Sequence, residues 1–382
     1  MNQELALKVM LSGRNCFLTG AAGAGKTYVL NQFIARAKKK KLRVAVTAST
    51  GLAATHISGM TVHSWSGIGV RKELGKNFFD KMKEKRFDAI RKADVLVIDE
   101  VSMLQDFYFD MIDDACKRAR NNGFQPFGGL QVIVCGDFFQ LPPVNKAGER
   151  AGGMAYEAVA WEQADFAILY LTEQHRQEDE EYLRILEGIR SGTYKRGQIE
   201  RLLERVGVEL GGDATMLCTH NYAADKINSK RLEDLDAGEN VFTMRLLGER
   251  RSCEKLAKNI LAPMDLRLKT GALVMAVKNS PEKRYYNGST GIVMGFAGLS
   301  KYPIVEFFNG ERVIVTPEEW LSFDGEERVA SVMQVPLRLA WAITVHKSQG
   351  LTFDRAIVDI GDAFAPGQIY VALSRLRSLD GL

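Results

Sequence analysis

Short apolar runs recur along the chain, and each ends in a small or polar residue. Helix-like segments, such as residues 26–39 and 105–120, separate most of these runs. Runs that are apolar along their whole length are typical of strands covered on both faces, so the pattern predicts parallel sheets in an α/β protein. Ligands of such sheets bind at the carboxyl ends of the strands, where the polar residues stand. The runs are CFLTG, RVAVTAST, DVLVIDE, QVIVCGD, FAILYLT, TMLCTH and RAIVDIG, which begin at Cys16, Arg43, Asp94, Gln131, Phe166, Thr215 and Arg355.

Two regions depart from this pattern. Between residues 266 and 323, short apolar segments alternate with turn signals such as Asn287-Gly288 and Asn309-Gly310. This alternation predicts a small β-barrel inserted in the second half of the chain. Residues 75–92 are charged and rich in lysine, and they lie between two strands of the first predicted sheet. This second stretch is either a small subdomain or an exposed arm.

Composition and charge narrow the class of protein only moderately. The chain has 382 residues, enough for two or three domains, and a formal net charge of +4. This mild excess of basic residues permits a nucleic-acid partner, provided that a local groove binds it. The sequence has neither an apolar run of membrane-spanning length nor the pattern of a secretory signal. Five scattered cysteines without a C-x-x-C pair indicate small buried residues in a reducing compartment.

Residues 20–27 read GAAGAGKT and fit the phosphate-binding pattern G-x-x-x-x-G-K-[ST] in full. An apolar run precedes them and a helical pattern follows, which is the context that this motif requires. Glycines let backbone N–H groups approach the β- and γ-phosphates of a nucleotide. Lys26 adds a positive charge to them, and the Thr27 hydroxyl ligates Mg²⁺. The residues expected to bind the nucleotide here are Gly20, Ala21, Ala22, Gly23, Ala24, Gly25, Lys26, Thr27 and Tyr28.

Two carboxylates, Asp99 and Glu100, end a strand pattern rich in valine and isoleucine. Such groups are costly to bury unless a positive charge pairs with them. A Mg²⁺ ion held by Asp99, usually through water, supplies that charge, and Glu100 is then placed to orient and deprotonate an attacking water. Together with the glycine-rich loop, this pair predicts a nucleoside triphosphatase.

Seven segments, in this order along the chain, resemble the helicase motifs of superfamily one, and in particular the petite-integration-frequency (PIF) family of 5′-to-3′ DNA helicases. They are FLTGAAGAGKT, TASTGLAATHISGMTVHSWSGIG, VLVIDEVSML, CGDFFQLPPV, LTEQHRQ, AITVHKSQGLTFD and YVALSRLRSLDGL. The resemblance covers essentially the whole chain. RecD-like and conjugative-relaxase helicases are the next relatives, and the long second segment favours the first family.

The resemblance implies an α/β fold with two RecA-like P-loop domains, at residues 1–170 and 171–382. The first domain would contain a wedge subdomain at about residues 66–92, which splits duplex DNA. The second would contain an SH3-like β-barrel at about residues 266–335, which encloses the strand. These two assignments rest on position in the chain and not on a chemical signature.

The resemblance also implies roles for single residues in binding and hydrolysing ATP with Mg²⁺. Gln3 corresponds to a glutamine that reads the adenine edge, and Gln140 corresponds to a sensor of the γ-phosphate. Asp137 falls near the magnesium and the attacking water. Arg176 and Arg375 are expected to reach the γ-phosphate from the second lobe, with Arg375 preferred as the arginine finger.

Polar residues at other strand ends are candidates for holding single-stranded DNA. Hydroxyls, backbone amides, a lysine and imidazoles suit phosphate oxygens, which hold a strand without reading its sequence. The two histidines stand in similar T-V-H contexts, and satisfied core histidines are the alternative interpretation. In the family, Gln349 and Gly350 lie near both DNA and nucleotide. The DNA-binding candidates are Ser49, Thr50, Gly51, Thr61, His63, Thr344, His346, Lys347 and Ser348.

Several aromatic residues are open to two interpretations, because they either stack on bases or pack in a core or interface. They are Trp65, Phe138, Phe139, Tyr285 and Tyr286. For Phe138 and Phe139, packing is favoured over base contact.

The motifs predict an ATP-dependent DNA helicase. The expected partners are single-stranded DNA and junctions of single- and double-stranded DNA, with no membrane and with a monomer on DNA. A cytoplasmic, nucleoid-associated location is favoured over the nucleus or mitochondrion of a eukaryote. The alternative function is a DNA-stimulated ATPase that translocates or remodels protein–DNA complexes without separating strands. A nucleotide-gated binding module with slow turnover is disfavoured, because Glu100, Gln140 and Arg375 occur together.

Overall fold

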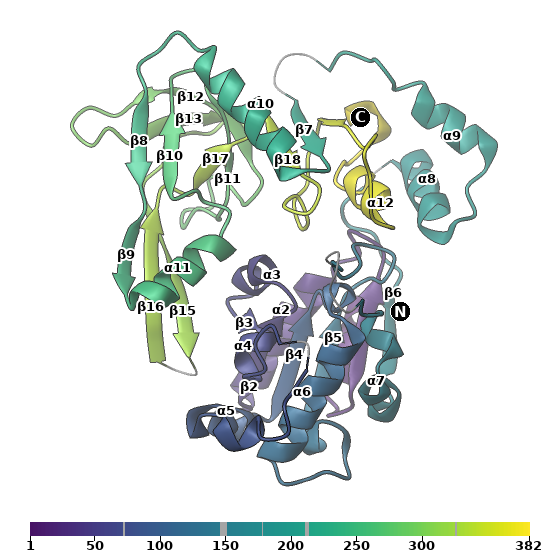
Figure 1. Cartoon of the computed structure of the whole chain (residues 1–382). Coiled ribbons are helices and arrows are strands. Elements are labelled where there is room, and N and C mark those ends of the chain that lie inside the picture. Colours follow the sequence, from purple (N-terminus) through teal and green to yellow (C-terminus); the bar gives the residue numbers. More distant parts are fainter. Residues whose placement is uncertain (72, 146–150, 178, 211–213, 325–326) are drawn as a thin grey trace. The chain divides into compact units, whose positions relative to one another are not determined.

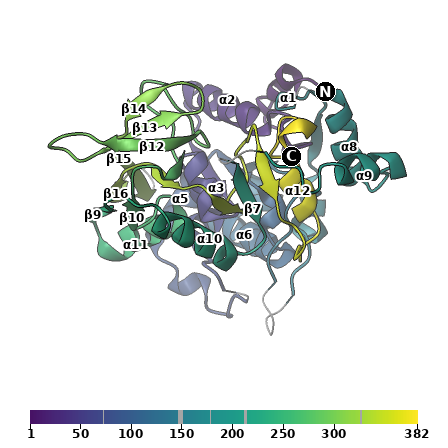
Figure 2. The ribbon, with the colours of Figure 1, turned by 90° about the horizontal axis from the view of Figure 1, so that it is seen from above.

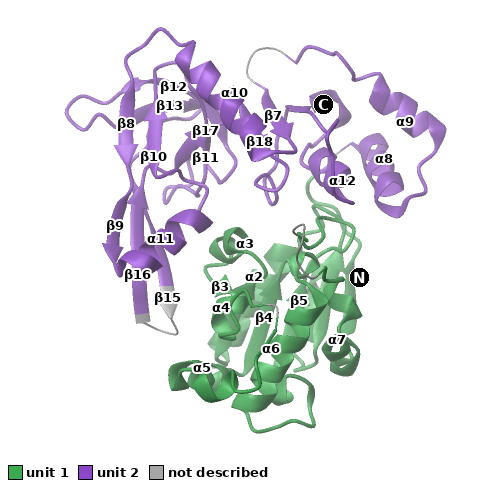
Figure 3. Ribbon diagram, in the orientation of Figure 1, with its two compact units in different colours: residues 1–176 green, residues 177–382 purple. Residues whose placement is uncertain are grey.

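In the computed structural model, apolar runs of the first half of the chain form one sheet of six parallel strands, in the order β3-β2-β4-β5-β1-β6 (Figure 1). The strands are β1 (Cys16–Gly20), β2 (Val44–Ala48), β3 (Met60–Thr61), β4 (Val95–Asp99), β5 (Gln131–Cys135) and β6 (Ala167–Leu171). The structure describes residues 1–71, 73–145, 151–177, 179–210, 214–324 and 327–382. It divides into two units, residues 1–176 and 177–382 (Figure 3).

Successive residues of the central strands point to opposite faces of this sheet, as pleating requires. In β4, Leu96 and Ile98 belong to the core beneath α6 (Asp106–Ala119), whereas Val95 and Val97 belong to the core beneath α1 (Gln3–Met10) and α2 (Lys26–Lys39). Both sets are buried. The continuous apolar pattern of this strand therefore reflects a sheet with helices on both faces.

The strand β6 differs from that expectation because it lies at the edge of the sheet. Ile168 is 67% exposed and Tyr170 is 41% exposed, while Leu169 and Leu171 are buried. The run FAILYLT is therefore covered on one face only, and the prediction that both of its faces are covered is wrong. An edge strand has one neighbour, so its outer face receives less cover from helices.

Short helices complete the first unit. Two of them begin at a hydroxyl cap: Thr50 accepts a hydrogen bond from the Ala53 N–H at 3.2 Å, and Thr61 accepts one from the Ser64 N–H at 3.3 Å. These elements are α3 (Gly51–His56), α4 (Val62–Trp65), α5 (Glu84–Lys92), α7 (Val159–Ala164) and the 3₁₀ turns η1 (Phe79–Lys81), η2 (Val101–Met103), η3 (Pro126–Gly129) and η4 (Ala155–Glu157).

The second unit is built around a smaller parallel sheet of three strands, in the order β18-β7-β19. These strands are β7 (Thr215–Cys218), β18 (Ala342–Thr344) and β19 (Ala356–Val358). In the helix α8 (Glu180–Ser191), the Asp179 carboxylate caps the start and Gly192, with a φ of 70°, ends it. The other helical elements are α9 (Arg196–Leu203), α10 (Asn221–Glu233), α11 (Arg250–Asn259), α12 (Gln368–Leu373) and η5 (Leu379–Gly381).

The remaining strands of the second unit form antiparallel sheets. Five of them follow the order β14-β13-β12-β11-β17, three follow β15-β16-β9, and β10 pairs with β8. Figure 2 shows β12, β13 and β14 side by side. The strands within the range predicted as a barrel thus divide between three sheets, and each sheet also includes a strand from outside that range, namely β17, β9 or β8. The strands are β8 (Asn240–Thr243), β9 (Arg245–Gly248), β10 (Asp265–Leu268), β11 (Leu273–Ala276), β12 (Thr290–Phe296), β13 (Pro303–Phe307), β14 (Arg312–Ile314), β15 (Glu318–Asp324), β16 (Glu327–Gln334) and β17 (Leu337–Leu339).

Two further expectations concern cysteines and membrane spans. All five cysteines are buried and carry free thiols, as expected of small core residues. Among the described residues, no helix has the length and apolar character that crossing a membrane requires.

Candidate functional site

The glycine-rich loop connects the buried strand β1 to the helix α2 and folds around the ammonium group of Lys26. Gly23 and Gly25 adopt positive φ angles of 88° and 81°. The Lys26 Nζ donates to the carbonyl oxygens of Gly20 at 2.8 Å and Ala21 at 3.0 Å. Burial lowers the pKa of Lys26, and the negative charges of Asp137 and Glu100 oppose that shift. The loop therefore has the backbone shape and the charge of a phosphate cradle.

The two ends of the loop favour glycine for different reasons. A Cβ atom on Gly20 would lie 2.8 Å from the Leu171 carbonyl oxygen, whereas Gly25 has a positive φ of 81°, which other residues seldom adopt. Between these ends, Ala22 and Ala24 are buried and stabilise the turn, whereas Thr27 and Tyr28 are exposed at the start of α2. The exposed Thr27 hydroxyl has the position expected of a magnesium ligand, at the loop-to-helix junction.

Two side chains from distant parts of the chain meet at the rim of the loop. Gln3 Nε2 lies 3.0 Å from His175 Nε2 and 3.4 Å from the Ala24 carbonyl oxygen. The backbone N–H of His175 donates to the Gly23 carbonyl oxygen at 3.1 Å. The sequence predicted Gln3 beside the nucleotide site but not His175, although His175 directly precedes Arg176 in the segment LTEQHRQ.

Arg176 is the last residue of the first unit, whereas the resemblance implied that it acts from the second lobe. Its positive charge contributes to the lowered pKa of Lys26, so it lies within electrostatic reach of the phosphate loop. The backbone bond of His175 to Gly23 holds this segment against the loop. Arg176 therefore belongs to the first unit and not to the second, as the resemblance had implied.

The carboxylate of Asp99 is buried at the end of β4. It accepts a hydrogen bond from the Glu100 N–H at 2.9 Å. Burial raises the pKa of Asp99, while that hydrogen bond, a second one from the Cys135 thiol and the charge of Lys26 oppose the rise. A nearby cation stabilises the charged form of such a buried carboxylate, as the expected role of Asp99 in holding Mg²⁺ requires.

The neighbouring Glu100 has an unusual backbone conformation. Its φ and ψ are 52° and 45°, in the left-handed region that a non-glycine residue seldom adopts. The Ser49 hydroxyl donates to the Glu100 carbonyl oxygen at 2.6 Å, and the Ser49 N–H donates to the Asp99 carbonyl oxygen at 3.0 Å. Ser49, at the end of β2, thus helps to fix the conformation of both acidic residues.

After β5, Asp137 and Gln140 form a buried pair. Asp137 is 1% exposed, and it accepts hydrogen bonds from Gln140 Nε2 and from the Phe139 N–H, both at 3.2 Å. The charge of Asp137 raises the pKa of Lys26 more than any other neighbour does. The carboxyl edge of the first sheet thus brings together Lys26, Asp99, Glu100, Asp137 and Gln140.

Arg375 lies in the second unit and is 2% exposed. Its Nε donates to the Val371 carbonyl oxygen and its Nη2 to the Ser374 hydroxyl, both at 2.8 Å. The resemblance implied that this arginine reaches the γ-phosphate of ATP. In the structure, the guanidinium is bonded to the end of the preceding helix α12 and to its C-cap residue, Ser374. The sequence pattern gave no signal of this burial.

The DNA-binding candidates of the first unit fall into two groups. Ser49 is buried, whereas Thr50, Gly51, Thr61 and His63 are half-buried. A cap hydroxyl such as that of Thr50 or Thr61 accepts a backbone hydrogen bond and keeps its own proton for donation. The His63 ring packs edge-on against Tyr108, with centroids 4.5 Å apart.

In the second unit, the turn that follows β18 contains both buried and partly exposed side chains. Thr344 and Ser348 are buried, and the Ser348 hydroxyl donates to the Val345 carbonyl oxygen at 2.8 Å. Both side chains make hydrogen bonds within the turn, and the expectation that these two residues hold DNA stays a prediction. His346 and Lys347 remain half-exposed, and burial lowers the pKa of each. The exposed Gly350 follows, with a φ of 83°.

Phe364, an exposed aromatic residue that contacts His346, was not among the candidates predicted from the sequence. The Phe364 ring stacks on His346 with centroids 6.0 Å apart and also contacts His220 at 5.3 Å. Phe364 is 58% exposed. A ring flanked by two imidazoles next to a lysine is a surface suited to a nucleic-acid strand.

For most of the aromatic residues with two interpretations, the structure shows whether the side chain is packed in a core or exposed. Trp65 is buried, and Phe138 packs against Phe17, Tyr156 and Trp161, as the packing interpretation predicted. Phe139 is 53% exposed.

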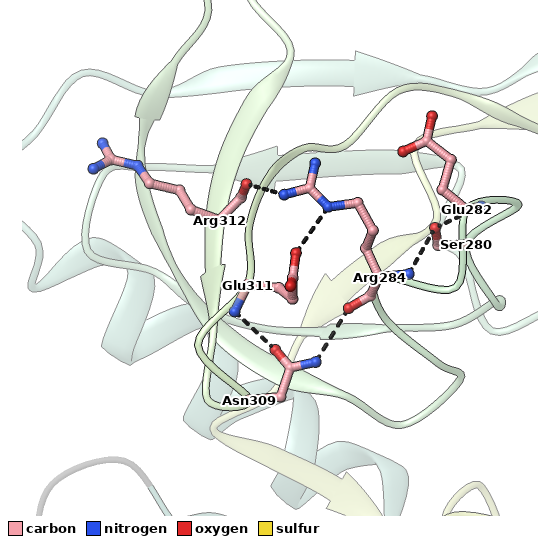
Figure 4. A network of polar contacts seen from close by, with 6 residues as sticks. All are labelled: Ser280, Glu282, Arg284, Asn309, Glu311 and Arg312. Atoms are coloured by element: carbon pink, nitrogen blue, oxygen red, sulfur yellow. Dashed lines mark hydrogen bonds and ion pairs between the residues drawn. The ribbon is translucent and has the colours of Figure 1, made fainter.

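Tyr285 and Tyr286 are neighbours with opposite surroundings. Tyr285 is buried and stacks on Phe307 with centroids 4.8 Å apart, whereas Tyr286 is exposed. Figure 4 shows the polar network that holds this loop: Arg284 contacts the Glu311 carboxylate at 2.8 Å and the Arg312 carbonyl oxygen at 2.9 Å. Tyr285 is therefore a core residue, and Tyr286 keeps the base-stacking interpretation open.

A parallel sheet whose first strand leads through a glycine-rich loop into a helix, with paired acids at the end of β4, defines a P-loop nucleoside triphosphatase. The sequence profile of the PIF1-like helicases matches residues 3–194. The chain is also 38% identical to the ATP-dependent DNA helicase Pif1 of Psychrobacter sp., over 100% of this chain and 67% of that protein. The chain belongs to the PIF1-like helicase family.

Solved structures agree with this assignment. Pif1 of Bacteroides sp. in complex with ADP-AlF4 has a TM-score of 0.87 and 32% identity, over 99% of this chain and 90% of that one. Bacteroides Pif1 bound to ssDNA has a TM-score of 0.66 and 32% identity, with the same coverage of 99% and 90%. The chain spans 60% and 59% of the length of two further curated relatives.

Proposed function

We propose that this protein is an ATP-dependent DNA helicase that translocates 5′-to-3′ along single-stranded DNA and unwinds duplex or structured DNA. The observation that carries the proposal is the convergence of Lys26, Asp99 and Glu100 at the carboxyl edge of the first sheet, in a chain of the PIF1-like helicase family. The Bacteroides relative was solved with ADP-AlF4 and with ssDNA, which supports the same pair of ligands here.

The residues of the phosphate loop fit ATP and Mg²⁺. Lys26 would offer phosphate oxygens the ammonium that now contacts the carbonyls of Gly20 and Ala21. Thr27 and Asp99 would hold the Mg²⁺, which when bound neutralises charge on the phosphates. In the described parts of the chain, no group of three or more His, Cys, Asp or Glu side chains is placed to hold a metal. Phosphate oxygens of the nucleotide and water would supply the other ligands of the ion.

We assign the chemical steps to a small set of side chains. Glu100 orients the attacking water and accepts its proton, while Asp137 and Gln140 stand beside it as a hydrogen-bonded pair. Gln3 reads the adenine edge from the rim of the loop. Arg176 and Arg375 neutralise charge on the transferring phosphoryl group, and Arg375 is the proposed arginine finger.

The DNA surface that we propose rests on groups suited to phosphate oxygens. In the first unit these are the hydroxyls of Thr50 and Thr61 with the backbone of Gly51 and the imidazole of His63. In the second unit they are His346 and Lys347, with Phe364 as a neighbouring ring.

Replacing both His346 and Lys347 by alanine is expected to weaken single-strand affinity about tenfold and to lower the salt slope of log K by about 1, because only Lys347 of the two contributes a positive charge. Fluorescence anisotropy at several salt concentrations measures both quantities. Lys230→Ala, which removes an exposed lysine of α10, is the matched control. An unchanged salt slope in the double variant would place the phosphate contacts elsewhere.

An unwinding assay on tailed duplexes tests the function itself. We expect ATP-dependent strand separation on a duplex with a 5′ single-stranded tail and none on a duplex with a 3′ tail. Hydrolysis stimulated by single-stranded DNA without strand separation on any fork would contradict the helicase assignment and leave the translocase. The absence of any DNA stimulation would contradict both.

Two finer points belong to the same proposal. We propose that the protein acts on DNA as a monomer in a bacterial cytoplasm, associated with the nucleoid. The relatives that it matches include bacterial and eukaryotic helicases, and the bacterial ones motivate this part of the proposal. Sedimentation of the protein with a 5′-tailed fork measures the stoichiometry.

A further inference from the structure

The amide group of Gln3 lies at the rim of the phosphate loop, on a backbone that the start of α1 holds in place. Gln3 is the first residue of this helix, and the Asn2 side chain caps the helix by accepting a hydrogen bond from the Leu5 N–H at 2.9 Å. The helix is anchored because Ala6 and Met10 are buried in the core that α1 shares with α2. The side chain of Gln3 therefore starts from a fixed point, and its own rotation remains to be set.

The imidazole of His175 lies against the same part of the loop. The backbone N–H of His175 bonds to the Gly23 carbonyl oxygen, which holds this residue at the loop. A Cβ atom built on Gly25 would lie 3.5 Å from His175 Cδ2 and 2.2 Å from Gln3 Nε2, so both side chains lie beside Gly25. The imidazole therefore has a defined place next to the Gln3 amide.

Hydrogen bonding decides which end of the Gln3 amide faces His175. The Ala24 carbonyl oxygen, 3.4 Å from Gln3 Nε2, can only accept a hydrogen bond, so the amide nitrogen faces this side. The second proton of that nitrogen is available to His175 Nε2, which lies 3.0 Å away. The imidazole can accept this bond in the neutral tautomer that carries its proton on Nδ1. A proton on Nε2 would set two donors against each other, and turning the amide to relieve this would give up the bond to Ala24.

The amide oxygen of Gln3 is the end that remains for a ligand. Among the residues that the structure describes, no hydrogen bond to Gln3 Oε1 is found. Adenine presents an amino group, a donor, where guanine presents a carbonyl oxygen, an acceptor. An amide oxygen at the rim therefore favours adenine, whereas an amide turned by half a rotation would present its nitrogen and favour guanine. The orientation of this amide, and not only its presence, sets the base preference.

Glu173 also approaches the imidazole of His175. Its Oε2 lies 3.6 Å from His175 Nε2, which is beyond hydrogen-bonding range. The side chains of Glu173 and His175 are 46% and 52% exposed, so solvent screens this contact. Gln3, at 3.0 Å, is therefore the closer partner of the imidazole.

We propose that His175 is a positioning residue that fixes the amide orientation of Gln3 and so makes the nucleotide site select adenine over guanine. The inference rests on the proposed role of Gln3 as the reader of the adenine edge, and it deepens that role. His175 acts through Gln3 and not by a contact of its own with the base. A base bound at this rim would shield the bond between the two side chains from water, which strengthens it.

Replacing His175 by phenylalanine tests this role, because the ring remains and its nitrogen acceptor is removed. The ratio of kcat/KM for ATP to that for GTP, measured with saturating single-stranded DNA, is expected to fall about fivefold. The change is expected in KM for ATP, with kcat within about twofold, since the amide contacts the base and not the reacting phosphate. His175→Gln restores an acceptor near the position of Nε2 and is expected to keep the ratio within about twofold of the unmodified protein.

A double-mutant cycle with Gln3 separates an indirect action of His175 from a direct one. Gln3→Ala removes the amide, and adding His175→Phe to it is expected to change the ratio by at most about twofold more, because no amide is left to orient. Glu173→Gln neutralises the neighbouring carboxylate and is the matched control, expected to keep the ratio of the unmodified protein. Circular dichroism checks that each variant is folded.

An unchanged ratio in His175→Phe, or equal use of ATP and GTP by the unmodified protein, would overturn the proposal. Additive losses in the cycle would contradict it as well, because His175 would then act independently of Gln3. An equal loss in Glu173→Gln would assign the effect to that carboxylate instead.

The adenine-reading role and the helicase function have their own outcomes. An unchanged ratio in Gln3→Ala would remove both the role of Gln3 and the positioning role of His175. Hydrolysis stimulated by single-stranded DNA in the unmodified protein tests the helicase function separately. Its failure is therefore distinguishable from failure of the positioning role.

Discussion

Replacing Glu100 by glutamine is expected to lower ATP turnover by about 10²–10⁴-fold and to leave nucleotide affinity within about twofold. Glutamine has the size of glutamate but cannot accept the proton of an attacking water. The backbone at this position is held in its left-handed conformation by neighbours that the substitution leaves in place. Ser49 donates to its carbonyl oxygen, and the Asp99 carboxylate accepts from its N–H.

A steady-state phosphate-release assay with single-stranded DNA measures turnover, and a fluorescent nucleotide analogue measures affinity. Glu162→Gln changes an exposed glutamate of α7 and is the matched control. Turnover near the level of this control would remove Glu100 from its role. A combined loss of turnover and affinity would mean that Glu100 shapes the nucleotide site itself.

The phosphate site was predictable from the sequence because its determinants are local. A buried strand, a loop with glycine at fixed positions and a helix that starts at Lys26 are consecutive in the chain, so spacing alone specifies their geometry. Asp99 and Asp137 follow two other buried strands of the same sheet, and parallel strands bring their carboxyl ends to one edge. The pattern therefore placed these residues together without knowledge of the strand order.

Features that depend on distant contacts were not predictable. The contact of His175 with Gly23 joins residues far apart in the chain, and no local pattern encodes it. The pairing of β9 with β16 is likewise non-local. The burial of Ser348 was also not predictable from the sequence, because a serine next to a lysine occurs in turns with its hydroxyl either exposed or buried.

Arg375→Ala is expected to lower the rate constant of hydrolysis by about 10³-fold or more, if the guanidinium acts as the arginine finger. Removing a buried cation that contacts the Val371 carbonyl oxygen and the Ser374 hydroxyl is also expected to destabilise the second unit. The two effects differ in their readouts. Turnover at saturating ATP and DNA reports the first, and the midpoint of thermal unfolding reports the second.

Arg377 provides the matched control, because it lies two residues further on and is exposed, with an ion pair to Asp354 at 3.0 Å. Arg377→Ala is expected to keep turnover within about twofold of the unmodified protein, since an exposed ion pair contributes little. A folded Arg375→Ala variant with normal turnover and a lowered unfolding midpoint would assign Arg375 to the stability of α12 alone. In that case Arg176, which acts on the pKa of Lys26 from within the first unit, becomes the arginine finger to test.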